Sequence, residues 1–258
     1  MLNYDKALES FENYIRQYDS TDDKIKLKII HTFGVVECAS YIAIHEKMNE
    51  EQQELAKIIA LLHDIGRFEQ LKQYHSFDDR NVDHASIAIE YLFKQGHIRD
   101  YIEEDQYDTL ISFAIKNHSA YEIETTNNKE IKRQAYLIRD ADKLDNFRVK
   151  EKDNFKDMFP SIYNEKTINY EKISNKVFED FMQHKCIILS DRKTIIDYWV
   201  CVIGFIFDLN FYISLKYVKD NNCINILIDR IEYKDNDTKQ KMEQIRNCAK
   251  EYIEKRAI

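Results

Sequence analysis

Apolar residues recur along most of the chain with the spacing of α-helices. Within residues 51–64, Leu55, Ile58, Ile59 and Leu62 follow the i, i+3, i+4, i+7 pattern that places side chains on one helical face. The same kind of spacing predicts further helices over residues 24–47, 83–95, 106–118, 128–146, 170–188, 191–218, 221–232 and 235–256.

Two stretches lack this pattern and are predicted to be loops. Residues 65–82 have Gly66 near their start and mix polar with aromatic side chains. Residues 148–169 contain Pro160, which interrupts any helix. Between them, Asn127 and Glu130 have the spacing of a capping box, which would open the helix over 128–146.

Turn-forming residues are scarce. The chain has four Gly and one Pro, whereas a β-sandwich or barrel needs a turn roughly every 8–12 residues. We therefore predict an all-α fold, with a helical core over residues 1–150 and a C-terminal helical extension packed on it over residues 151–258. No strong boundary separates these parts, so a single domain is the alternative.

Charge and cysteine content narrow the partners and the compartment. The net charge is −8 and no run of Lys or Arg occurs, which argues against a long nucleic acid as partner. The five cysteines form no C-x-x-C pair, so we expect reduced thiols in a cytoplasmic protein. The most apolar run, residues 198–207, is about half as long as a bilayer requires. We expect no membrane association, and a homo-oligomer is left open.

Several predicted helices carry a metal-binding side chain on an otherwise apolar face. These side chains are His31, His63 with Asp64, His84, His118 and Asp142. One histidine on such a face is usually a hydrogen-bonded core residue, and Asp142 alone could pair with Arg139 or Arg148. An isolated buried carboxylate is costly, however, and inward-facing ligands from several helices are how a helical bundle builds a metal site.

The order H…HD…H…H…D resembles the HD superfamily of metal-dependent phosphohydrolases. The resemblance covers residues 25–150 and rests on the segments His31-Thr-Phe-Gly-Val-Val, Ala60-Leu-Leu-His63-Asp64-Ile-Gly66-Arg67, Asp83-His84-Ala85, Asn117-His118 and Arg139-Asp140-Ala141-Asp142-Lys143-Leu144-Asp145. It implies that His31, His63, Asp64 and Asp142 hold a first metal ion. It also implies that His84 and His118 hold a second ion, with Asp64 as the bridging and catalytically essential carboxylate.

Two subgroups of this superfamily fit poorly. HD-GYP enzymes carry a Gly-Tyr-Pro motif, whereas the only proline here, Pro160, follows Phe159. Alarmone hydrolases continue the HD pair into an acidic Glu-Asp pair, and here Arg67 and Phe68 stand at the matching positions.

The predicted ligands also indicate a chemistry. Four neutral imidazoles and two carboxylates around two divalent ions leave a formal charge of about +2, which attracts an anion. Such donors suit Mn, Fe, Co, Ni or Zn, and an ion of this kind activates water as a nucleophile. Arg67 and Lys143 flank the motif and are predicted to bind phosphate oxygens, while His75 is either a general acid or a solvated loop residue.

We therefore expect a phosphohydrolase, with one or two divalent ions, that acts on a small phosphorylated molecule such as a nucleotide or a phosphomonoester. One alternative is a dinuclear iron oxygenase similar to myo-inositol oxygenase or to a phosphonate-cleaving oxygenase, which use the same order of six ligands. The other is a regulatory protein that retains the metal without turnover.

Overall fold

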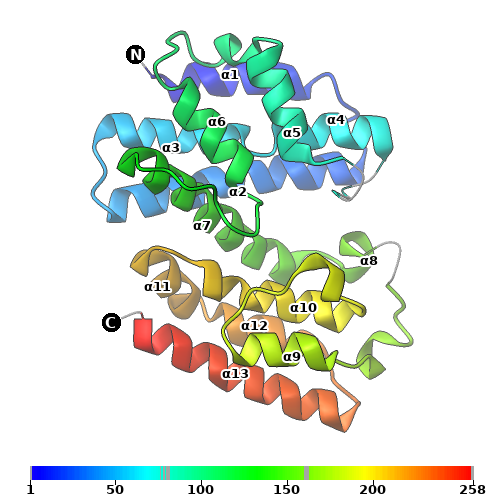
Figure 1. The fold of residues 1–258 in the computed structure, drawn as a ribbon. Coiled ribbons are helices and arrows are strands. Elements are labelled where there is room, and N and C mark those ends of the chain that lie inside the picture. Colours follow the sequence, from blue (N-terminus) through cyan, green and yellow to red (C-terminus); the bar gives the residue numbers. More distant parts are fainter. Residues whose placement is uncertain (1, 76, 78, 80–81, 160–162, 257–258) are drawn as a thin grey trace. The chain divides into compact units, whose positions relative to one another are not determined.

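Helices account for the regular structure of this protein. The computed structural model describes residues 2–75, 77, 79, 82–159 and 163–256, and within these ranges it contains helices and no strands (Figure 1). The predicted all-α class is therefore confirmed. The chain divides into two units, residues 1–145 and 146–258, and the long helix α7 (Lys129–Lys152) passes from the first to the second.

The first unit is built around a helical hairpin. The pair consists of α2 (Asp23–His45) and α3 (Glu50–Leu62), which are joined by a short turn and pack along each other. Around the pair lie α1 (Tyr4–Ile15), α4 (Ile65–Tyr74), α5 (His84–Ile89), the π-helix η1 (Glu90–Lys94), the 3₁₀-helix η2 (His97–Asp100), α6 (Asp108–Asn117) and the first part of α7.

Side-chain caps fix where these helices begin. The carboxylate of Asp22 accepts hydrogen bonds from the first turn of α2, and Asn49 forms a capping box with Gln52 at α3. At α7 the predicted capping box of Asn127 was wrong. The neighbouring Asn128 accepts from the N–H groups of residues 130 and 131 at 2.9 and 3.2 Å instead.

Two helices of the first unit were not predicted. Residues 65–74 form α4 rather than a loop, and they bury Ile65, Phe68 and Leu71 on one side. Helix α1 buries Phe11 completely, with ring centroids of Phe33 and Phe68 at 6.2 and 6.0 Å. Both helices are short and owe their stability to this packing, because isolated helices of such length are marginal in water.

Helix α2 is the most apolar long helix of the described chain. It alone among the described helices is long and apolar enough to cross a membrane by length and composition, which is weak evidence for a span. Half of its apolar window is buried within the protein, and its buried residues include His31. Packing against α3 and α4 accounts for the buried half of these apolar residues.

The second unit contains α8 (Phe155–Met158), α9 (Asn175–Met182), α10 (Ile195–Ile203), α11 (Tyr212–Asp220), α12 (Cys223–Asp229) and α13 (Asn236–Arg256), with short 3₁₀ turns between them. Its core centres on Trp199, which is fully buried and donates its indole N–H to the carbonyl of Leu227 at 2.8 Å. The buried carboxylate of Asp197 accepts from the N–H and hydroxyl groups of Ser174 at 2.8 and 2.7 Å.

Several predicted boundaries in this half were wrong. The helix over 191–218 is interrupted by a 3₁₀ turn at Gly204–Asp208 and by an irregular stretch before α11. Of residues 170–188, only Asn175–Met182 are α-helical. Helix α7 continues to Lys152 because Phe147 and Val149 are buried. Pro160, the basis of the predicted loop, lies outside the described residues.

Candidate metal centre

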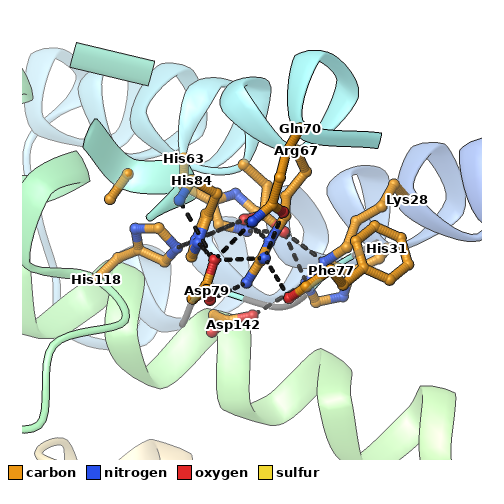
Figure 2. Close-up of polar contacts among 12 residues, drawn as sticks. Lys28, His31, His63, Arg67, Gln70, Phe77, Asp79, His84, His118 and Asp142 are labelled. Atoms are coloured by element: carbon orange, nitrogen blue, oxygen red, sulfur yellow. Dashed lines mark hydrogen bonds and ion pairs between the residues drawn. The ribbon is translucent and has the colours of Figure 1, made fainter. Parts of the chain in front are cut away.

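The structure brings the six predicted ligands together in the first unit (Figure 2). They come from five places in the fold: His31 from α2, His63 and Asp64 from the link between α3 and α4, His84 from the first residue of α5, His118 from the residue after α6, and Asp142 from α7. All are buried except Asp142, whose side chain is 20% exposed. Asp142 is thus the candidate ligand that solvent partly reaches.

The carboxylate of Asp64 lies between two pairs of histidines. Its Oδ2 atom is 3.8 Å from Nε2 of His31 and 3.5 Å from Nε2 of His63. Its Oδ1 atom is 3.2 Å from Nε2 of His84 and 3.6 Å from Nε2 of His118. Each oxygen thus faces a different pair of imidazoles, which is the arrangement of a carboxylate that bridges two ions.

The remaining distances also suit a shared coordination sphere. Nε2 of His31 is 3.0 Å from Oδ1 of Asp142, and Nε2 of His84 is 3.0 Å from Nε2 of His118. Donor atoms that each lie about 2.0–2.2 Å from one ion are about 3 Å apart from one another. The donors are therefore close enough to bind ions with little rearrangement.

Carboxylates orient one histidine of each pair. Nδ1 of His31 lies 2.6 Å from Oδ2 of Asp145, and Nδ1 of His84 lies 2.9 Å from Oδ1 of Asp79. An imidazole that donates its Nδ1 proton to a carboxylate keeps Nε2 as the more basic donor atom. Neither Asp79 nor Asp145 was predicted to take part in the site.

Backbone carbonyls orient the other histidine of each pair. Nδ1 of His63 donates to the carbonyl of Ala60, and Nδ1 of His118 donates to the carbonyl of Ile115, each at 2.7 Å. Among the described residues, Nε2 of His63 is a buried nitrogen without a hydrogen-bond partner. A buried nitrogen whose lone pair has no partner is energetically costly. A metal ion bound to this lone pair would remove the cost, so the residues present fit a metal.

The histidines differ in their affinity for protons. Burial lowers the pKa of His63 to about 4, so its imidazole is neutral and ready to bind a metal at pH 7. Burial also acts to lower the pKa of His31, but its hydrogen bonds to Asp142 and Asp145 outweigh burial and raise it. Neighbouring carboxylates raise the pKa of His84 against burial in the same way. At these two positions a divalent ion competes with a proton.

Both ligand carboxylates are held in their charged form. Burial acts to raise the pKa of Asp64, but neighbouring positive charge, first of all the ammonium of Lys28, holds it well below its usual range. The pKa of Asp142 is likewise lowered, because the hydrogen bond from His31 outweighs burial. Charged carboxylates are the form that ligates a cation.

A glycine and a buried arginine help to position His84 and His118. A Cβ atom at Gly66 would lie 2.2 Å from the carbonyl oxygen of His84, so only glycine lets α4 approach the start of α5 this closely. The buried guanidinium of Arg139 donates to the carbonyls of Asn117 and Ala120 at 2.8 and 2.5 Å. It thereby fixes the end of α6, next to His118.

The two predicted phosphate-binding residues lie in different surroundings. The guanidinium of Arg67 pairs with both oxygens of Asp79 at 2.8 Å, and its Nε atom is 3.7 Å from Oδ1 of Asp64. Lys143 is buried, and its ammonium lies 3.4 Å from the carbonyl of Arg139. The phosphate-binding roles of both side chains stay predictions.

His75, which we considered as a general acid, ends α4. Its backbone is in the left-handed conformation, with φ of 51°, and the residue is exposed. Its carbonyl accepts a hydrogen bond from the ammonium of Lys24 at 2.9 Å. An exposed histidine at a helix end fits the solvated alternative.

A third group of candidate ligands lies beside the site but has other partners. It consists of Asp79, Asp83 and His84. Arg67 already pairs with both oxygens of Asp79. Asp83 caps α5 by accepting from the N–H of Ser86 at 2.9 Å. These contacts explain the group as support for α5 and for His84.

Sequence reasoning missed three side chains that touch the ligands. Asp145 follows Asp142 at i+3 on α7, and Lys28 precedes His31 at i−3 on α2, so helical spacing was a signal for both. Asp79 comes from a stretch without periodicity, and nothing in the sequence links it to His84.

Comparison with protein families agrees with this geometry. The model of the HD domain matches residues 29–146, a range that contains all six ligands. No curated protein and no solved structure shows a significant match to the chain.

Proposed function

We propose that this protein, whose residues 29–146 match the model of the HD domain, is a metal-dependent phosphohydrolase that acts on a small phosphorylated molecule, a nucleotide or a phosphomonoester. The observation that carries this proposal is the position of Asp64, with a different histidine pair on each carboxylate oxygen. Such an arrangement suits two divalent ions and the displacement at phosphorus that they promote.

In this proposal the two ions have separate ligands apart from the shared carboxylate of Asp64. The first would be held by His31, His63, Asp64 and Asp142, and the second by His84, His118 and Asp64. This set of imidazole and carboxylate donors suits Mn, Fe, Co, Ni or Zn and disfavours Ca. When bound, the ions lower the pKa of water to supply a nucleophile and polarise the phosphoryl group.

The protein contributes orientation and charge. Asp79 and Asp145 hold one imidazole of each pair with Nε2 turned inward, and Asp142 is the ligand that solvent partly reaches. Lys28 and Arg67 place positive charge within 4 Å of Asp64. We also propose a cytoplasmic location, because the five cysteines are odd in number and form no C-x-x-C pair.

Iron-dependent oxygenation is the competing chemistry, because the same six donors would also serve two iron ions. The two reactions differ in what the metal must do. A hydrolase needs a redox-silent Lewis acid, so several divalent metals support turnover without oxygen. An oxygenase needs iron that changes its oxidation state and a coordination position open to O₂. The cations beside Asp64 suit a phosphorylated substrate in either case.

The deciding experiment supplies Mn under strict anaerobiosis and measures release of phosphate or pyrophosphate from a panel of nucleotides and sugar phosphates. We expect release by the wild-type protein and none by Asp64→Ala, which removes the ligand shared by both ions. Asp23→Ala is the matched control, because this aspartate is exposed at the start of α2. Absence of release with any metal, together with substrate-dependent oxygen consumption by the iron-loaded protein, would replace the hydrolase with an oxygenase.

A further inference from the structure

Lys28 is the cation in closest contact with the proposed bridging carboxylate. Its ammonium lies 2.6 Å from Oδ2 of Asp64, whereas the nearest approach of Arg67 to that carboxylate is 3.7 Å. Lys28 precedes His31 by one helical turn on α2, and 17% of its side chain is exposed. The ammonium therefore lies at the edge of the site, on the side of the first proposed ion.

The ring of Phe77 covers this ammonium. Nζ of Lys28 is 5.3 Å from the centre of the ring, and Cζ of Arg67 is 5.8 Å from the same centre (Figure 2). An aromatic face attracts cations and limits the access of water. A charge in such surroundings interacts more strongly with an anion than a solvated lysine does.

A counter-ion role for Lys28 fits poorly with a carboxylate that serves two metals. Asp64 would then have its negative charge balanced by two divalent ions, and both ions would repel the nearby ammonium. Three cationic centres at this distance become compatible when an anion lies between them. The ammonium is paired with Asp64 in this structure, and with both ions bound it would need another anion, which an anionic group of the substrate can supply.

Arg67 is less suited to this role, because its guanidinium is already bound. It pairs with both oxygens of Asp79 and also donates to the carbonyl of Phe77 at 2.9 Å and to Gln70 at 2.7 Å. For Lys28, by contrast, Asp64 is the acidic partner within 4 Å in the part of the chain that the structure describes. Its flexible stem lets the ammonium move from that carboxylate to a ligand.

We propose that Lys28 binds a non-bridging phosphate oxygen of the substrate beside the first metal position. This inference rests on the proposed phosphohydrolase function. A compact ammonium next to two divalent ions favours a dianionic phosphate, such as a phosphomonoester or the terminal phosphate of a nucleotide, over a monoanionic diester.

The test measures binding of inorganic phosphate to the Mn-loaded protein by calorimetry. Lys28→Met keeps a long, unbranched side chain and removes its charge, and Lys28→Arg keeps the charge. Lys26→Met is the matched control, because Lys26 lies on the same helix, 52% exposed, and pairs with Asp23. Thermal unfolding and Mn content are measured for every variant.

We expect Lys28→Met to keep its bound Mn and to raise the Kd for phosphate roughly tenfold or more, as the loss of a charge-assisted hydrogen bond implies. Lys28→Arg should recover most of the affinity, and Lys26→Met should match the wild type. Unchanged phosphate affinity in Lys28→Met would overturn the assignment, and so would loss of Mn from that variant. Wild-type protein that binds Mn but neither binds nor releases phosphate would contradict the phosphohydrolase function itself.

Discussion

Asp145 and Asp79 each hydrogen-bond to a different histidine of the site. We therefore predict that a change at one of them weakens the binding of one metal ion and not of the other. Oδ2 of Asp145 lies 2.6 Å from Nδ1 of His31, and the Asp145 side chain is fully buried. Asp145→Asn keeps the size of the side chain and removes the charge that makes Nε2 of His31 a strong donor. Loss of such a partner typically costs about 10–100-fold in metal affinity, which is about 1.4 to 2.8 kcal/mol. We expect this loss for the first ion alone.

Asp79→Asn is the matched variant for the second ion, because Oδ1 of Asp79 lies 2.9 Å from Nδ1 of His84. The assay titrates metal-free protein with Zn²⁺ in competition with a chromophoric chelator, which gives the number of ions and the Kd of each. Thermal unfolding of both variants controls for loss of structure. A variant that lowers the affinity for both ions equally would contradict this assignment. So would unchanged affinity for both ions in both variants.

Two further predictions concern the packing that supports the site. Gly66→Ala should lower the affinity for the second ion more than for the first, because the new Cβ would lie 2.2 Å from the carbonyl oxygen of His84. The same chelator titration measures both affinities, and an equal loss at both sites would contradict the prediction. Phe11→Ala should lower the free energy of unfolding by about 3–5 kcal/mol, because this ring is fully buried between α1 and the rest of the first unit. Urea denaturation measures the change, and a loss below about 1 kcal/mol would show that α1 adds little to the unit.

The positions of the candidate ligands could be predicted where a polar side chain interrupts a regular apolar pattern. His31 and Asp142 interrupt helical faces that are otherwise apolar, and a buried polar group needs a partner. The pattern gave both the helix and the side of it on which the ligand lies. The structure brings these two side chains to 3.0 Å, although α2 and α7 are far apart in the sequence.

The supporting residues were harder to predict, because their partners depend on packing rather than on spacing. Arg67 lies beside the motif in the sequence, yet its guanidinium binds Asp79, twelve residues away in an aperiodic stretch. Lys28 contacts Asp64 across 36 residues, and it does so only because α2 and α3 pack together. Helix α4 was not predicted for a related reason. Its three buried apolar residues, Ile65, Phe68 and Leu71, are too few to make a clear helical pattern over ten residues.

The summed charge of the site stays at about +2 once these neighbours are included, but the charges are distributed differently. The sequence-based estimate of about +2 considered only two divalent ions, Asp64 and Asp142. Asp79 and Asp145 add two negative charges, and Lys28 and Arg67 restore two positive ones. The charge of Arg67 is largely neutralised by its ion pair with Asp79. Of the two added cations, Lys28 therefore attracts an anionic ligand more strongly. Removal of Lys28 lowers the summed charge of the site from about +2 to about +1, and it leaves every metal ligand in place, so it should affect phosphate binding more than metal binding.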